Sequence, residues 1–159
     1  MGIRQSQSSH FALNARSAKR RVALEIGIDE ALISRVVDRF YGKVRADPLL
    51  GPIFLTHVQQ WDDHLERMKR FWRSVMHNSG EYNGRPMPKH VAIEGLDDRH
   101  FERWLRLFYE TLHELAPSEA AIQQFGSKAR TIADSILTGI ALHHRGIIGS
   151  KAGKDLPHV

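Results

Sequence analysis

The chain has 159 residues, 42% of them hydrophobic and 26% charged, which is the composition of a globular protein with a single domain. It has no cysteine, so disulfide bonds, thiolate catalysis and cysteine-ligated zinc or iron–sulfur centres are excluded, and any metal would need His, Met, Tyr or carboxylate ligands. The formal net charge of +5 favours an anionic partner, such as nucleic acid, an acidic protein or an anionic cofactor.

Four segments show helical spacing, in which apolar residues recur at every third or fourth position. The first begins at Asp29, a residue type that caps helix N-termini, and ends before Pro48. Pro117 separates the third segment from the fourth. We expect helices over residues 29–45, 59–76, 97–115 and 118–143.

The remaining residues are predicted to be less regular. Residues 18–27 favour a short additional helix, and residues 86–95 have room for only a turn or two. Residues 1–14 are rich in Ser and Gln, and they favour disorder, as does the end of the chain. No segment reads as a strand, so the fold class is all-α. We divide the chain into a flexible basic N-terminal extension (1–20), a helical domain (21–144) and a flexible C-terminal tail (145–159).

Several aromatic residues carry polar tips on faces that are otherwise apolar. Tyr41, His64 and Trp104 each fall on the inward face of a predicted helix. Buried Tyr and Trp usually need a hydrogen-bond partner for their polar atoms. Three side chains whose polar atoms point into one apolar core suggest that a polar group lies within that core. A plain helical core is the alternative that the spacing leaves open.

One histidine follows a stiff stretch of chain, NGRPMPKHVAI, residues 83–93. Pro86 and Pro88 restrict the backbone just before His90. A rigid backbone suits a metal ligand that must be held at a fixed place. A histidine that is only hydrogen-bonded fits the same pattern, and the same two alternatives stay open for His64.

Four blocks of sequence together resemble the truncated haemoglobins, and within them group III. They are FYGKVRADPLLGPIF (40–54), WDDHLERMKRFW (61–72), YNGRPMPKH (82–90) and HFERWLRLF (100–108). The resemblance covers roughly residues 28–142. The chain contains no Gly-Gly pair, whereas groups I and II typically carry such pairs at helix junctions.

The resemblance implies a shortened globin, with two helices stacked on two helices around haem b, in the domain 21–144. His90 matches the proximal histidine that ligates the haem iron. Its second ring nitrogen is then expected to donate a hydrogen bond to a backbone carbonyl or to water. Tyr41, His64 and Trp104 match the polar residues of the distal pocket.

Four further residues are assigned to haem contact on the same basis. Phe54 matches the phenylalanine that packs on the haem face, and Arg67 matches a basic residue near a haem propionate. Met68 and Met87 are expected to contact the cofactor. The N-terminal extension and the C-terminal tail depart from the family pattern, and the resemblance gives them no role.

The resemblance implies reversible binding of O2, CO or NO, with the distal side chains as donors that stabilise negative charge on the ligand. The same donors suit NO dioxygenase or peroxidase-like chemistry on NO or peroxide. Such turnover would need an external reductant, and a basic surface favours an acidic electron-donor protein. The sequence does not decide between an oxygen carrier and such an enzyme, so enzymatic activity stays an open question.

The alternative is a basic helical module that binds nucleic acid or protein without haem. The chain has no evident basic recognition helix, and its aromatic residues look buried rather than available for stacking on bases. We therefore expect no nucleic-acid partner. Because no apolar run approaches the roughly 20 residues of a membrane span, and because a chain without cysteine suits a reducing compartment, we expect a cytoplasmic protein.

Overall fold

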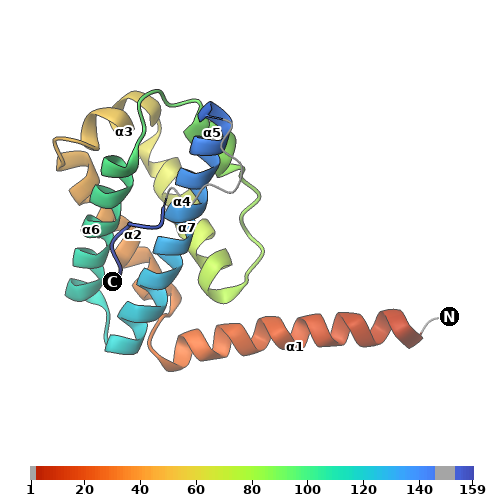
Figure 1. The fold of residues 1–159 in the computed structure, drawn as a ribbon. Coiled ribbons are helices and arrows are strands. Elements are labelled where there is room, and N and C mark those ends of the chain that lie inside the picture. The colour runs from red at the N-terminus through yellow and green to blue at the C-terminus, as the bar shows by residue number, and fades with distance from the viewer. Residues whose placement is uncertain (1–2, 146–152) are drawn as a thin grey trace.

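The computed structural model describes residues 3–145 and 153–159, with side chains from residue 10 to 144 and from 153 onward. Within these ranges the chain is helical and contains no strand (Figure 1). None of the described helices is both long enough and apolar enough to cross a membrane. The helices are α1 (Ile3–Glu25), α2 (Glu30–Ala46), α3 (Gly51–His57), α4 (Trp61–His77), α5 (Pro86–Val91), α6 (Asp98–Leu115) and α7 (Glu119–Arg145).

Local sequence signals fix the ends of several helices. Asp29 caps α2, where its carboxylate accepts a hydrogen bond from the Leu32 N–H at 2.7 Å. Asp97 caps α6. The Nδ1 of His100 accepts a hydrogen bond from the Asp97 N–H, which completes a capping box. Pro86 opens the short helix α5, where the N–H that it lacks would have no helical partner.

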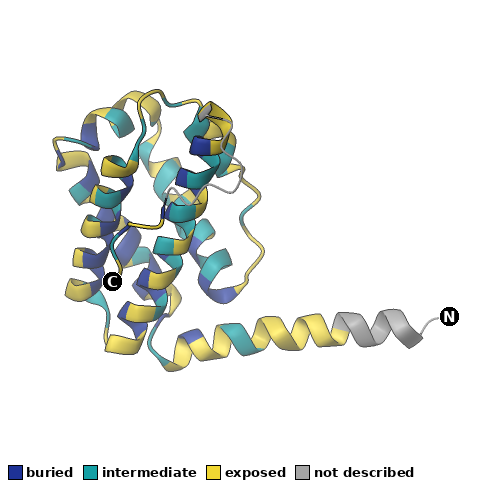
Figure 2. Ribbon diagram, in the orientation of Figure 1, coloured by how far each residue is buried: buried dark blue, intermediate teal, exposed yellow. Residues whose placement is uncertain are grey.

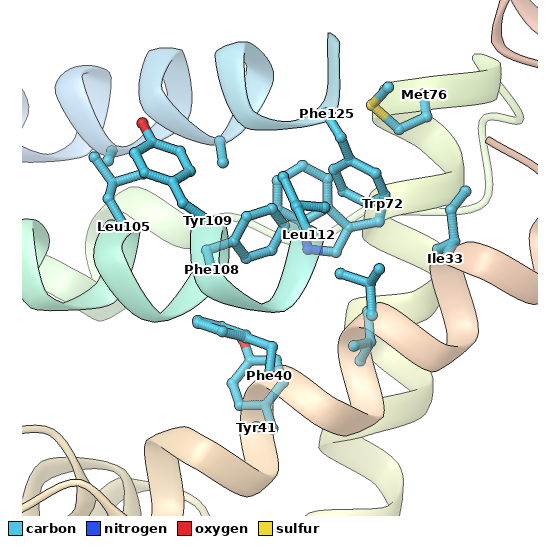
Figure 3. Close-up of a cluster of buried hydrophobic side chains, with 14 of the residues drawn as sticks. Ile33, Phe40, Tyr41, Trp72, Met76, Leu105, Phe108, Tyr109, Leu112 and Phe125 are labelled. Carbon is cyan, nitrogen blue, oxygen red and sulfur yellow. The ribbon is translucent and has the colours of Figure 1, made fainter. Parts of the chain in front are cut away.

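The four longest predicted helices pack around one core. Helix α6 lies against α2 on one side and α7 on the other, and α2 also packs against α4. Aromatic rings fill the centre: the Phe108 ring lies 5.0 Å from both Phe40 and Trp72, and Phe125 closes the group at 5.1 Å from Trp72 (Figure 3). These four residues are buried, all of them nearly or wholly inaccessible.

Apolar burial, rather than surface charge, holds these helices together. Lys43 of α2 reaches Glu110 and Glu114 of α6 at 2.9 and 2.6 Å, but both carboxylates are partly exposed. Exposed ion pairs of this kind contribute about 0–1 kcal/mol each, whereas burying one large apolar side chain contributes about 1.5–3 kcal/mol.

The N-terminal region differs from the sequence expectation. We expected disorder over 1–14 and a short helix over 18–27, but residues 3–25 form the single helix α1. No Gly or Pro interrupts this stretch, so nothing in it breaks a helix. Helix α1 extends away from the other helices, and its described side chains are mostly exposed (Figure 2). The predicted boundary at residue 20 falls inside α1.

The C-terminal residues also differ from a flexible tail. Residues 146–152 lie outside the described part, but residues 153–159 are seated on α6 and α7. The Tyr109 hydroxyl donates to the Pro157 carbonyl at 2.7 Å, and Arg130 Nε donates to the Leu156 carbonyl at 3.2 Å. Leu156 is only 5% exposed. Charged and small residues gave this segment a tail-like composition, but two hydrogen-bond donors and a buried leucine hold it.

Helix α3 was not predicted. It has seven residues, which is too short for the helical period to be recognised in the sequence. Its N-terminal turn contains Pro52, and Asp47 caps the preceding turn by accepting bonds from Leu49 N and Leu50 N at 3.0 and 2.9 Å.

Candidate functional site

A cavity of about 520 Å³ lies between α2, α3, α4, α5, α6 and α7. Its volume falls within the range of small-molecule and cofactor sites, and most of its lining side chains are apolar. The sequence analysis assigned eight residues to a site, and seven of them line this cavity. These seven are Tyr41, Phe54, His64, Arg67, Met68, His90 and Trp104.

The eighth, Met87, does not line the cavity. A Cβ placed at Gly139 of α7 would collide with the Met87 thioether, so the methionine packs against α7. Met87 lies in the first turn of α5, one turn before His90, and the pattern of that turn does not show which neighbour it faces. The glycine lets α5 approach α7 closely, and Met87 contributes to this packing.

His90 lies near the C-terminal end of α5, and its ring orientation is fixed by its own helix. Its Nδ1 lies 2.6 Å from the Pro86 carbonyl, four residues earlier. Because a carbonyl can only accept, Nδ1 carries the hydrogen and donates it. In a neutral imidazole the other nitrogen, Nε2, then keeps a free lone pair. The hydrogen bond that we expected at the second ring nitrogen is therefore present.

Tyr41 belongs to α2 and is 5% exposed. Its ring makes edge contacts with Phe40 at 5.0 Å and with Phe54 at 5.8 Å. Burial raises the pKa of Tyr41 well above its ordinary value, because the charged phenolate would lose its hydration. The hydroxyl is therefore protonated at neutral pH and can donate a hydrogen bond.

His64 of α4 lies beside Tyr41, with the two ring centroids 5.1 Å apart and nearly perpendicular. Its Nε2 is buried and has no hydrogen-bond partner among the described residues. Burial, assisted by the positive charges of Arg67 and Lys89, lowers the pKa of His64 to about 4. The ring is therefore neutral at pH 7. A buried polar atom without a partner costs about 1–3 kcal/mol, so this wall fits a cavity whose occupant offers a polar atom.

Trp104 of α6 is positioned by the aromatic core. Its ring stacks on Phe108, one helical turn away, at 5.4 Å and 15°, and meets the edge of Phe40 at 5.3 Å. The fully buried Phe108 and Phe40 thus fix the plane of an indole that lines the cavity. The helical phase of Trp104 predicted this inward direction correctly.

Positive charge lies at the edge of the cavity. Arg67 and Lys89 are both exposed residues that line it, and Tyr82 contributes a phenol from the loop before α5. The sequence analysis named Arg67 but missed Lys89 and Tyr82. The signal for Lys89 was its place directly before His90, whereas nothing in the sequence distinguishes Tyr82 from an ordinary loop residue.

Apolar residues of α7 complete the wall. Ile132 and Ile136 carry the helical spacing of a core face, and the structure shows that they line the cavity together with Ala133. Core residues and cavity-lining residues have the same spacing, so the sequence alone cannot separate them. Among the described residues, no group of three or more His, Asp or Glu side chains is arranged to hold a metal ion by itself.

Helices packed around an apolar cavity, with a histidine whose Nδ1 is hydrogen-bonded to the backbone of its own helix, are the arrangement of globins of the shortened, two-over-two kind. The structure of the 2/2 haemoglobin from Synechococcus sp. PCC 7002, in the cyanomet state and with covalently attached haem, superimposes with a TM-score of 0.63. The match covers 72% of this chain and 96% of that one, and at 23% identity it shows the fold alone.

Sequence comparisons show the family. The bacterial-like globin family matches residues 24–137. The group 3 truncated haemoglobin of Campylobacter jejuni is 36% identical over 90 residues, which is 54% of this chain and 71% of that protein. A crystal structure of the group III truncated haemoglobin from Campylobacter jejuni superimposes with a TM-score of 0.65 and 32% identity, over 69% of this chain and 89% of that one. The chain belongs to the bacterial-like globins and, within them, to the group III truncated haemoglobins.

This membership confirms the predicted family and the predicted all-α, two-over-two fold class. It also implies haem binding, which is a property of the globin family. The alternative of a basic helical module without haem receives no support from these comparisons.

Proposed function

We propose that the chain binds haem b in this cavity with His90 as the axial ligand of the iron, and that a small molecule such as O2, CO or NO binds reversibly on the opposite side. The observation that carries this proposal is the hydrogen bond from His90 Nδ1 to the Pro86 carbonyl at 2.6 Å. It leaves Nε2 as a free lone pair in an apolar cavity of suitable size. The haem, when bound, supplies the iron to which the small ligand attaches.

His90 holds the proximal side. A hydrogen bond from Nδ1 fixes the tautomer and raises the basicity of Nε2, which strengthens it as a ligand. Pro86 and Pro88 stiffen the short helix, and α5 packs against α7. The imidazole is thus held by its own backbone rather than by a flexible partner.

Three donors form the distal side. Tyr41, His64 and Trp104 come from α2, α4 and α6, whereas His90 comes from α5, which packs against α7. The origin of the two groups on different helices supports their placement on different walls of the cavity. The Tyr41 hydroxyl and the Trp104 indole N–H can both donate. A hydrogen bond to a charged acceptor contributes about 1.5–3 kcal/mol, which corresponds to roughly ten- to more than hundredfold in ligand dissociation.

The edge of the cavity suits an anionic cofactor. Arg67 and Lys89 can pair with the two propionate carboxylates of haem b, and both remain partly solvated. Such exposed pairs orient the cofactor more than they increase its affinity. The apolar side chains of Phe54 and Met68 line the cavity and exclude water from its interior.

The cluster of three distal donors also favours a second candidate function, the conversion of NO or peroxide. The same donors that stabilise negative charge on a bound ligand would polarise an O–O bond. This turnover requires an external electron donor, and the net charge of +5 favours an acidic one. Consumption of NO by the O2-saturated protein in the presence of a reductant, measured with an NO electrode, separates this function from reversible binding alone.

Absorbance spectra of the purified protein test the main proposal. We expect a Soret band in the ferric protein that shifts on reduction with dithionite and again on addition of CO. These shifts require bound haem with an iron site that a small ligand can reach. If no Soret band appears even after hemin is added, the proposed function is wrong.

A further inference from the structure

The His64 ring is held by other rings. It meets Tyr41 at 5.1 Å, Trp61 at 5.6 Å and Phe54 at 6.4 Å, in each case edge to face. Its Nε2 has no hydrogen-bond partner among the described residues. Ring packing is therefore the interaction that keeps this side chain turned into the cavity.

Trp61 is a ring neighbour of His64 that does not line the cavity. It is the first residue of α4, one helical turn before His64, and it is partly buried. Tyr41, Phe54 and His64 line the cavity, but Trp61 does not. Trp61 also contacts the Tyr41 ring at 6.3 Å. The indole therefore contacts both His64 and Tyr41 without forming part of the cavity lining, and its loss would remove one of the three ring contacts of His64.

Arg45 fixes Trp61 from the outside. It lies in the last turn of α2, and its guanidinium carbon is 4.3 Å from the centre of the Trp61 ring, which is a cation–π contact. Arg45 takes part in none of the ion pairs that the described residues form. The contact ties the end of α2 to the start of α4 across the segment that contains α3.

We propose that Trp61 and Arg45 are positioning residues that hold His64 turned inward and so control the access of small ligands to the site. This inference rests on the proposed function, because it concerns access to the iron. The His64 side chain lines the cavity and is partly exposed to solvent. Loss of the indole removes a ring that packs against the imidazole, which can then turn outward and open a path.

The position of His64 can be measured without relying on haem. Diethyl pyrocarbonate acylates accessible neutral imidazoles, and peptide mass spectrometry of the purified protein quantifies each histidine separately. Exposed His113 of α6 serves as an internal reference. We compare wild type with Trp61→Ala, Trp61→Phe and Arg45→Ala. Arg35→Ala is the matched control, because Arg35 is another exposed arginine of α2 and is not in contact with Trp61.

The expected changes follow from the strength of the contacts. Loss of the Trp61 ring contact with His64 in Trp61→Ala should raise the acylation rate of His64 roughly three- to tenfold, since an aromatic pair is worth a few-fold or more in equilibrium. Arg45→Ala should raise it about two- to fivefold, as expected for an exposed cation–π contact. Trp61→Phe keeps an aromatic ring in contact with His64 and should stay near wild type, as should Arg35→Ala.

The second readout is the association rate of CO after flash photolysis of the haem-loaded protein. It should rise in the same order as the acylation of His64. Unchanged acylation of His64 in a folded Trp61→Ala protein would overturn the inference. So would an equal rise at His113, because that result indicates general loosening. Failure of the proposed function is distinct: the Soret band would be missing while the acylation pattern could still be measured.

Discussion

The Nδ1–H of His90 donates a hydrogen bond to the carbonyl of Pro86, one turn earlier in α5, over 2.6 Å. The donor and acceptor belong to the same six-residue helix, which two prolines stiffen. The orientation of the imidazole is therefore built into a local segment. The packing of α5 against α7 then places this segment at the wall of the cavity.

Replacement of His90 by glycine should remove the axial ligand and leave a space for a free imidazole. We expect His90→Gly to lose most of its bound haem, and added imidazole to restore the Soret band. Absorbance titration with hemin, with and without imidazole, measures both effects. His113→Ala is the control, because His113 is exposed and does not line the cavity. Full haem content and an unchanged spectrum in His90→Gly would show that another residue is the ligand.

Removal of the Tyr41 hydroxyl should weaken ligand retention but not haem binding. We expect Tyr41→Phe to keep its haem and to release O2 roughly ten- to more than hundredfold faster, since one hydrogen bond to a charged group is lost. Stopped-flow replacement of O2 by CO gives the rate. Tyr109→Phe is the matched control, because that hydroxyl donates to Pro157 and not into the cavity. An unchanged O2 dissociation rate in Tyr41→Phe would mean that Trp104 or His64 is the main donor.

The low pKa of His64 predicts a dependence of stability on pH. Its pKa is about 4 in the folded protein, below the ordinary value of 6.5, so the unfolded chain binds the proton more tightly. Stability from this group is complete above pH 6.5 and is lost as the pH falls toward 4. His64 is partly solvated, so the loss should be about 1–2 kcal/mol, well below the value for a fully buried group.

Denaturant unfolding at pH 7 and pH 5 measures this effect. His64→Leu removes the titrating group, so its stability should fall less than that of wild type between the two pH values. Equal losses in the two proteins would show that His64 does not contribute to the acid sensitivity.

The docked C-terminal segment should contribute to stability. Leu156 is 5% exposed, and truncation of a buried leucine in a core costs about 2–5 kcal/mol. Because a terminal segment can detach, we expect Leu156→Ala to cost less, about 1–2 kcal/mol. Urea unfolding of the variant measures the loss. Asp155→Ala is the control, since an exposed substitution should stay within about 0.5 kcal/mol. An unfolding midpoint equal to that of wild type in Leu156→Ala would mean that the segment is not docked in solution.

Much of the fold was predictable because its signals are local. The four core helices (α2, α4, α6 and α7) begin and end within two residues of their predicted limits, since capping residues such as Asp29 and Asp97 and a regular apolar period define them. The family was predictable because four blocks of sequence keep their order. Seven of the eight predicted site residues line one cavity, because their positions were assigned from these same blocks.

Other features depend on contacts between residues far apart in the chain. The sequence placed Met87 at the cofactor, but the approach of α5 to Gly139 turns it toward α7. It gave no sign that Arg45 would lie over the Trp61 ring. It also gave no sign that Leu156 would be buried against helices that come earlier in the sequence. Such contacts have no signature in local spacing.

The sequence by itself determined the four core helices α2, α4, α6 and α7, the family, and the residue types that can ligate iron and donate to a ligand, because these depend on capping, period and motif. Only the tertiary structure decided which side chains line the cavity, that the His64 Nε2 is buried without a partner in the described part of the chain, and that Trp61 packs against the His64 ring. The physical reason is that burial, ring packing and lowered pKa values arise when separate helices meet, and no single segment contains them.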